Sequence, residues 1–531
     1  MRGRGMLVAV VVAVTMAACT AAPTPDEPVT PSPSPSPVMP AKPGVPTRPV
    51  AEHLAPVLPG VDSPDRPVVR GDDVSGLPVA PGEDLAAYWD QELVWRDCAP
   101  AQCATVLVPL DWENPGLAAL EISVTRLRSR TGILGPLFFN PGGPGGAAGP
   151  VIRGMEPDLL PGFDLVGWDP RGVGESTAVR CAPEALTAAY EADGSPDDEA
   201  ERVMLRQAWQ NLAESCRELS GVLLEHVSTV EVARDLDLLR HLFKVPRTSY
   251  LGISYGSLLG ATYAELFPER VGRMVLDGAV EVTGERPLVS LAGLERALGH
   301  FANWCGTESS CPLGDSGAEV VERISGLLQR LDRAPLSVGS RTLTQGLAAR
   351  GVAGSLYWGE HHYPGLATDI MQAIDGDGAG LLFASDLNTD YDDGWLQAAS
   401  ALPAVVCADR PDRGFLAALE ELVGVRAEAP VFAASLGTQP MCEFWTAWVQ
   451  PPLQLRGEGA PPILVIGRTG DPVTPLENSA RLSERLESAQ LLTVDGIGHV
   501  SLNRRDPCVE RAVARYLTLG ILPGPGESCP G

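Results

Sequence analysis

A serine between two glycines is the residue of this chain best placed to do chemistry. Ser254 lies in Gly-Ile-Ser-Tyr-Gly, after an apolar run at 249–253 that predicts a strand and before a pattern at 255–267 that predicts a helix. A strand that turns abruptly into a helix strains the backbone of the serine, and glycines at 252 and 256 leave room for the close strand-to-helix packing. The spacing predicts that Ser254 is a nucleophile for acyl transfer.

A glycine-rich loop supplies the second chemical feature. The apolar stretch 134–140 runs into Asn-Pro-Gly-Gly-Pro-Gly-Gly at 140–146, which reads as a strand followed by a loop that can present backbone N–H groups to an anion. We predict an oxyanion hole made by the N–H groups of Gly143 and of Tyr255, the residue after the nucleophile. Such donors typically contribute about 3 kcal/mol each to the transition state.

An aspartate and a histidine each follow a predicted strand. Asp471 comes after the apolar run 463–467, and His499 comes after the run 490–494. We predict that His499 is the general base and acid and that Asp471 orients and supports its ring. The chain order serine, aspartate, histidine is the one that α/β-hydrolases use.

Longer motifs around these residues extend the similarity. They are NPGGPG, FDLVGWDPRGVGES at 163–176, STVEVARDLDLLRHLF at 228–243, YLGISYGSLLGATYAELFPERVGRMVLDG at 250–278, GDPVTP and the Gly-His pair. From about residue 90 to its end, and most strongly at 137–280, the chain resembles the secreted tripeptidyl aminopeptidases of actinobacteria, a group of prolyl iminopeptidase-like α/β-hydrolases. Prolyl iminopeptidases usually have a histidine where this chain has Pro141, so the role of that histidine does not transfer. Asp277 and Asp495 also lie near strand ends, but they match family positions outside the triad.

The pattern of strands and helices predicts an α/β-hydrolase fold with a mostly parallel sheet. Strands are expected at 104–109, 120–127, 137–140, 164–168, 249–253, 273–277, 463–467 and 490–494, with helices at 229–243, 255–267 and 476–487. About 180 residues between Asp277 and Ile463 show helical periodicity, for example at 317–331 and 364–374, and should cover the carboxyl ends of the strands as a cap. We therefore expect a core at 86–290 and 456–531 and a cap at 291–455.

The N-terminal sequence predicts the cellular location of the protein. Arg2 and Arg4 precede an apolar run at 6–18 that is too short for a membrane span, and small residues precede Cys19, as in bacterial lipoproteins. We expect a signal peptide at 1–19, lipidation of Cys19 and anchoring at the outer face of the cell membrane or envelope, with ordinary secretion as the alternative. The tract 20–85, rich in proline, serine and threonine, should be an extended tether.

The chain has 11 cysteines, and ten remain besides Cys19. An even number in a secreted chain predicts disulfides. Two pairs look local, and the other three are inferred from proximity and agree with the resembled family; the five are Cys98 with Cys103, Cys305 with Cys311, Cys181 with Cys216, Cys407 with Cys442, and Cys508 with Cys529. A metal site is disfavoured because Cys-x-x-Cys pairs with histidine partners are absent from the sequence, and no cofactor is expected.

The net charge and the predicted cap limit the kinds of molecule that the protein is expected to bind. With 40 basic and 67 acidic residues the formal net charge is −27, which argues against nucleic acid and anionic membrane surfaces. The resemblance implies a serine exopeptidase that releases short peptides such as tripeptides from free N-termini; an esterase or lipase that acts on envelope lipids or other esters with the same triad is the alternative. We expect the protein to be a monomer. Glu360, Asp409 and Glu443 are candidates to bind the substrate amine. Asp169 and Arg171 are expected to brace the glycine-rich loop through an ion pair.

Overall fold

The computed structural model describes residues 74 and 76–530, except 158, 283–289, 388–392, 411–413, 446–452 and 505. The expected signal peptide, Cys19 and most of the tether lie outside these residues. Within them, no helix combines the length and the apolar composition needed to cross a bilayer.

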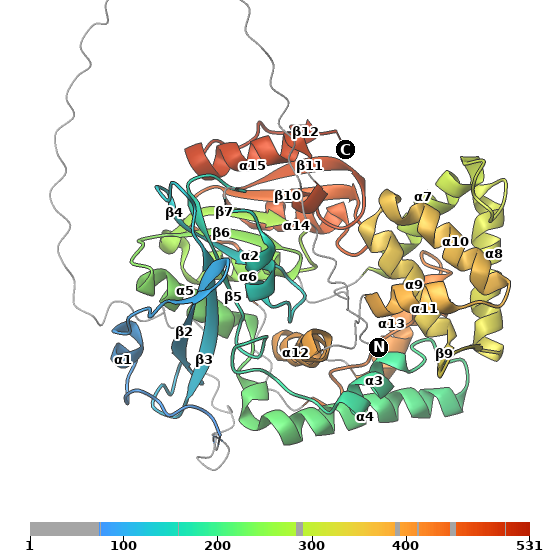
Figure 1. Ribbon diagram of the computed structural model, residues 1–531, viewed down its shortest axis with the longest axis horizontal. Helices are drawn as coiled ribbons and strands as arrows, with labels where there is room; N and C mark the ends of the chain where they lie inside the picture. The colour runs from blue at the N-terminus through green and yellow to red at the C-terminus, as the bar shows by residue number, and fades with distance from the viewer. Residues whose placement is uncertain are drawn as a thin grey trace, which may run out of the picture. The chain divides into compact units, whose positions relative to one another are not determined.

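One large sheet dominates the described part of the chain, with the strand order β1-β2-β3-β5-β4-β6-β7-β10-β11-β12 (Figure 1). Its strands are β1 (Arg96–Cys98), β2 (Ala101–Pro109), β3 (Ala119–Leu127), β4 (Gly135–Asn140), β5 (Phe163–Trp168), β6 (Thr248–Ile253), β7 (Val271–Asp277), β10 (Ile463–Gly470), β11 (Ala489–Ile497) and β12 (Ser528–Cys529). The pairs from β1 to β5 through β2 and β3 are antiparallel, and the pairs from β5 through β4 to β12 are parallel. The predicted mostly parallel sheet is therefore confirmed.

Both faces of the sheet are buried. Along β7, Met274 and Leu276 belong to one apolar cluster and Val275 to another, as the two-residue period of a strand requires. The first cluster includes side chains of α5 (Thr229–Leu242), α6 (Tyr255–Leu266) and α14 (Leu476–Arg485), and the second includes side chains of α2 (Ala148–Gly154) and α15 (Pro507–Leu519). Because helices pack on both faces of the sheet, the carboxyl ends of its parallel strands are held in place, and the predicted catalytic residues lie at these ends.

The insertion between β7 and β10 is mainly helical. It contains α7 (Leu291–Thr307), α8 (Gly317–Arg333), a short hairpin of β8 (Leu336–Val338) and β9 (Arg341–Leu343), α9 (Gln345–Trp358), α10 (Tyr363–Ile374), α11 (Ala379–Leu387), α12 (Asp393–Asp409) and α13 (Phe415–Val425). Helices α7 to α11, yellow to orange in Figure 1, share an apolar cluster of their own. By contrast, Ala404, Val405 and Ala408 of α12 belong to the cluster under the sheet. Helix α12 is thus part of the core as well as of the insertion.

A second helical excursion, after β5, has no counterpart among the predicted elements. It contains α3 (Pro183–Glu191) and α4 (Glu199–Ser220), and Arg206 of α4 forms an ion pair with Glu443 at 2.7 Å. Arg217 donates a hydrogen bond to the carbonyl oxygen of Phe444, and Arg341 of β9 pairs with Glu191. The main insertion is therefore attached to an element that precedes it, through contacts between residues 150 to 237 positions apart in the sequence.

The ten cysteines described in the structure form five disulfides. The pairs are Cys98–Cys103, Cys181–Cys216, Cys305–Cys311, Cys407–Cys442 and Cys508–Cys529. They are the same pairs that the sequence suggested. Cys407–Cys442 ties the end of α12 to the segment that contacts α4.

The expected ion pair between Asp169 and Arg171 is wrong. The carboxylate of Asp169 accepts hydrogen bonds from the backbone N–H groups of Gly149 and Glu175, at 3.0 and 2.9 Å, so it does brace the start of α2. Arg171 instead points to α5 and binds Asp235 in a bidentate pair of 2.6 and 2.7 Å. Its remaining N–H groups donate to backbone carbonyls, including that of Leu110 at 2.9 Å. Both partners are completely buried, which makes this pair a structural anchor of α5.

We expect Arg171→Met to destabilise the fold by about 3–5 kcal/mol, because it leaves Asp235 as an uncompensated buried charge. Arg153→Met is the matched control, since Arg153 pairs with Glu175 at the surface and its loss should cost less than about 1 kcal/mol. Chemical denaturation of the two variants and the wild type measures both effects. Equal, small losses would show that the buried pair does not anchor the fold.

Candidate active site

Ser254 occupies a sharp turn between β6 and α6. Its backbone has φ 56° and ψ −122°, a left-handed conformation that a residue other than glycine rarely adopts. Its N–H donates to the carbonyl oxygen of Asp277 at 2.9 Å, which holds the turn. A Cβ at Gly252 would lie 2.2 Å from the oxygen of Gly256, so the glycine is required for the helix to start there. This is the geometry of a nucleophile elbow, in which strain presents the serine hydroxyl.

The glycine-rich loop after β4 lies directly against this turn. Gly142 has φ 93°, and a Cβ there would be 2.5 Å from the carbonyl oxygen of Ile253 and 3.0 Å from the Cβ of Ser254. Gly143 follows with φ 113° and is exposed. Among the described residues its N–H finds no acceptor, and the N–H of Tyr255 lies in the first turn of α6, where helices leave such groups unpaired. Both N–H groups are therefore free to bind an oxyanion.

Asp471 and His499 form a buried pair at the ends of β10 and β11. Nδ1 of His499 lies 3.0 and 2.9 Å from the two carboxylate oxygens of Asp471. Burial alone would raise the pKa of Asp471, but the charge and hydrogen bond of His499 and the N–H groups of Val500 and Thr474 hold that pKa below its ordinary value. A carboxylate on Nδ1 leaves Nε2 of the imidazole as the proton acceptor, as a general base requires.

Thr474 is a third partner of this pair that the sequence prediction did not include. Its hydroxyl lies 2.9 Å from Oδ2 of Asp471 and 3.1 Å from Nδ1 of His499. Next to the histidine, Val500 has φ 55°, which is strained for a β-branched residue. The strain is maintained because the N–H of Val500 donates to Asp471 at 3.0 Å. Threonine three residues after the aspartate, in Gly-Asp-Pro-Val-Thr-Pro, is the signal that could have predicted this contact.

Asp277 joins the turn of Ser254 to the loop of His499. Its carbonyl oxygen accepts from the N–H of Ser254, and its Oδ2 accepts from the N–H groups of Ser501 and Leu502, both at 2.8 Å. Its Oδ1 has no hydrogen-bond partner among the described residues, and burial raises the pKa of Asp277 to about 6. A residue that the sequence prediction placed outside the triad therefore joins the turn of Ser254 to the loop of His499, two residues of the predicted triad.

The structure thus brings Asp471 and His499 into direct contact and sets the glycine-rich loop against Ser254. In the described part of the chain no hydrogen bond joins the hydroxyl of Ser254 to His499. Such contacts often tighten only when substrate binds. A strained serine, two free N–H groups and a carboxylate-supported histidine are the parts that acyl transfer through a covalent intermediate needs.

The three carboxylates proposed to bind a substrate amine lie in different surroundings. Glu360 is exposed in a 3₁₀ turn (Glu360–His362) after α9. Glu443 pairs with Arg206, and Asp409 lies at the end of α12 in contact with Thr229 and Tyr255. Only Asp409 touches a residue of the predicted oxyanion hole.

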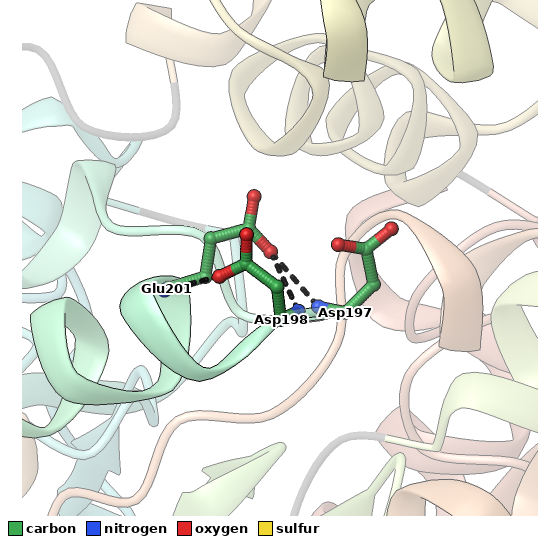
Figure 2. Close-up of side chains that lie close together, drawn as sticks. All are labelled: Asp197, Asp198 and Glu201. Carbon is green, nitrogen blue, oxygen red and sulfur yellow. Dashed lines mark hydrogen bonds between the residues drawn. The ribbon is translucent and has the colours of Figure 1, made fainter.

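A cluster of three acidic side chains at the start of α4 has a structural explanation (Figure 2). Asp197, Asp198 and Glu201 place carboxylate oxygens within 4.8 Å of one another. Asp198 accepts from the N–H of Glu201, and Glu201 accepts from the N–H groups of Asp197 and Asp198. This reciprocal capping box accounts for their proximity.

The fold and the site together define an α/β-hydrolase: a mostly parallel sheet, a serine at the turn after β6, and a helical insertion before the strand that precedes Asp471.

Residues 429–529 match the family model described as TAP-like protein. The chain is 31% identical to carboxylesterase B of Mycobacterium tuberculosis over 87% of this chain and 94% of the relative. It is 31% identical to the serine protease Hip1 of the same species, over 81% of this chain and 87% of the relative. It is 30% identical to tripeptidyl aminopeptidase of Streptomyces coelicolor, over 80% of this chain and 84% of the relative. The chain therefore belongs to the TAP-like family of α/β-hydrolases, and the resemblance seen in the sequence is confirmed.

Asp277→Asn should change how stability depends on pH. Because the pKa of Asp277 is raised from 3.8 to about 6, the folded protein keeps a proton that the unfolded chain has released between about pH 4 and pH 6. Its contribution to stability is thus fully present below pH 4 and is lost as the pH rises through 6.

We expect the stability of the wild type relative to Asp277→Asn to fall by roughly 2–3 kcal/mol between pH 4 and pH 7. Denaturation of both proteins at a series of pH values measures this difference. Parallel stability curves would contradict the assignment of a raised pKa to Asp277.

Proposed function

We propose that this hydrolase is a serine aminopeptidase that releases short peptides, tripeptides in particular, from free N-termini. Ser254 attacks the scissile carbonyl while His499 takes its proton, and Asp471 supports the imidazolium that forms. The N–H groups of Gly143 and Tyr255 stabilise the oxyanion. His499 then protonates the leaving amine, and water hydrolyses the acyl-enzyme by the reverse proton transfers.

The observation that carries this proposal is the buried Asp471–His499 pair fixed to the strained Ser254 turn through Asp277. The relatives named as a serine protease and a tripeptidyl aminopeptidase support peptide substrates. The relative named as a carboxylesterase supports ester hydrolysis as the second candidate, because the same triad serves both reactions. The helical insertion favours the exopeptidase, since a cap over the carboxyl ends of the strands admits a chain end more readily than a continuous chain.

We propose in addition that the enzyme acts as a monomer outside the cell, held to the envelope by a lipid on Cys19 and a tether at 20–85. The supporting observations are the sequence before Cys19 and the proline-rich composition that follows it. Cys19→Ser should release the protein from the envelope fraction, and mass spectrometry of the wild-type N-terminus should find a diacylglycerol. An unmodified N-terminus that starts elsewhere would rule out the lipid anchor.

The three triad residues should act as a unit. Ser254→Ala, His499→Ala and Asp471→Ala should each lose most of kcat, about a thousandfold or more, with the fold intact. The double variant Ser254→Ala with His499→Ala should lose little more than either single variant. Steady-state kinetics and circular dichroism check both statements, and additive losses would remove His499 or Ser254 from the triad.

Recognition of a free amine separates peptidase from esterase. A tripeptide coumarin amide with a free N-terminus should react about a hundredfold faster in kcat/KM than its N-acetylated form, because binding of the remote ammonium orients the scissile carbonyl. Equal rates, or faster turnover of long-chain acyl esters than of any free-amine peptide, would favour the esterase.

A further inference from the structure

The helical insertion reaches the predicted general base at the end of α9. The backbone N–H of His499 donates to the carbonyl oxygen of Tyr357, in the last turn of that helix, at 2.9 Å. Gly359, directly after α9, has φ 80°, and a Cβ there would lie 2.7 Å from the carbonyl oxygen of Ile497. The glycine therefore lets the end of the helix pack closely against the loop that carries His499.

Arg504 reinforces the same contact. Its Nη2 donates to the carbonyl oxygens of Tyr357 and His499, both at 3.1 Å, and its Nη1 donates to the carbonyl oxygen of Trp358. The last carbonyl groups of a helix have no partner within the helix, and the helix dipole also favours a cation at this end. One guanidinium group thus joins the end of α9 to the backbone of His499.

The aromatic ring of Tyr357 lies against the imidazole of His499. The two ring centroids are 4.7 Å apart, and the ring planes are inclined by 50°. Asp471 and Thr474 hold the imidazole at Nδ1. Hydrogen bonds at one ring atom still allow the ring to rock about that atom, whereas packing against a second ring restricts this motion. The contact therefore limits where Nε2, the predicted proton acceptor, can lie.

The side chain of Tyr357 acts through packing, because it carries no charge at neutral pH. Burial, with a smaller effect from the charge of Asp471, raises the pKa of its hydroxyl well above the ordinary value. Trp358 packs edge-on against the Tyr357 ring, with 5.2 Å between the centroids, and further fixes its position. What Tyr357 offers to His499 is therefore an aromatic surface and a backbone carbonyl.

The insertion also contacts the loop of the predicted triad aspartate. Val473 of that loop and Ile497 of the histidine loop both pack against the apolar cluster that helices α7 to α11 share. A Cβ at Gly293 of α7 would collide with the carbonyl oxygen of Pro472, so α7 lies directly against the aspartate loop. The insertion thus borders both loops of the acid–base pair, and a shift of its helices would be passed on to that pair.

We propose that Tyr357 is a positioning residue for the general base: its ring and its carbonyl oxygen hold the imidazole of His499 where Nε2 can accept the proton of Ser254. This inference rests on the proposed role of His499, and it applies to peptide and ester substrates alike. It makes the insertion a part of the catalytic arrangement, because the residue that places the base belongs to α9 and not to the sheet or its loops.

Steady-state kinetics on a free-amine tripeptide coumarin amide and on p-nitrophenyl butyrate test the ring contact. We expect Tyr357→Leu to lower kcat about 30-fold with KM within about twofold of the wild type, since misplacing a catalytic group by about 1 Å can cost about a hundredfold in rate. Tyr357→Phe keeps the ring and should retain kcat within about threefold.

Tyr363→Leu is the matched control. Tyr363 is a buried tyrosine of the insertion whose ring packs on Phe301 and Trp304. Its loss should lower the thermal midpoint at least as much as Tyr357→Leu does, while kcat stays within about threefold of the wild type. Circular dichroism with thermal melting checks that each variant folds.

The same substitution in a His499→Ala background separates positioning from general damage to the fold. Tyr357→Leu should lower the residual rate by less than about twofold there, because the residue that it positions is gone. Wild-type kcat in Tyr357→Leu, an equal loss of kcat in Tyr363→Leu, or a further large loss in the His499→Ala background would overturn the inference. If His499→Ala itself kept the wild-type kcat, the proposed function would fail, and this inference with it.

A pair of glycine substitutions tests the backbone contact with the side chain of Tyr357 intact. Gly359→Ala places a Cβ against the carbonyl oxygen of Ile497 and should push the end of α9 away from His499, which we expect to lower kcat about tenfold. Gly376→Ala is the control, because Gly376 also lies in the insertion, with φ 100°, but a Cβ there would meet no atom of the described residues within 4 Å. Both variants incur the strain of a left-handed alanine, so equal effects on kcat, or none in Gly359→Ala, would overturn the proposed role of this contact.

Discussion

The buried carboxylate of Asp277 is the constraint on which the catalytic arrangement depends. Parallel strands bring the ends of β6, β7, β10 and β11 to one edge of the sheet, but this alone does not set the turns that follow. Asp277 sets them by accepting from the N–H of Ser254 on one side and from the N–H groups of Ser501 and Leu502 on the other. An ionised carboxylate in this position is costly, as the raised pKa of Asp277 shows, and the two hydrogen bonds from Ser501 and Leu502 to Oδ2 offset part of that cost.

Strain is concentrated at the same place. Among the described residues four that are not glycine have positive φ, and two of them are Ser254 and Val500, at the predicted nucleophile and beside the predicted base. Each is held by a hydrogen bond from its N–H, which the backbone carbonyl oxygen of Asp277 accepts for Ser254 and the carboxylate of Asp471 accepts for Val500. Such conformations persist only where surrounding contacts over-determine them. The carboxylate of Asp471 therefore stabilises the strained backbone of Val500, and the main-chain carbonyl of Asp277 stabilises that of Ser254.

Structural features that depend on residues close together in the sequence could be predicted, whereas contacts between residues far apart in the sequence could not. The Gly-Ile-Ser-Tyr-Gly turn follows from strand, glycine and helix signals within a dozen residues, and the placement of Asp471 and His499 follows from strand ends. The partner of Arg171 could not be predicted, because Asp235 lies 64 residues further along the chain and spacing in the sequence does not show which distant residues come into contact. Likewise, the contact of α12 with α5 and Tyr255 arises because an insertion folds back onto the core, which no periodicity reveals. The contact of Asp409 with Tyr255, which distinguishes it from Glu360 and Glu443, therefore appeared only in the structure.

Ser254 should be the one serine that the Asp471–His499 pair and the surrounding turn activate. Reaction with a fluorophosphonate followed by intact-protein and peptide mass spectrometry tests it most directly. We expect one adduct per chain, located on Ser254, absent in Ser254→Ala, and formed far more slowly in His499→Ala. An adduct on another serine, or labelling of Ser254 at the same rate without His499, would contradict it.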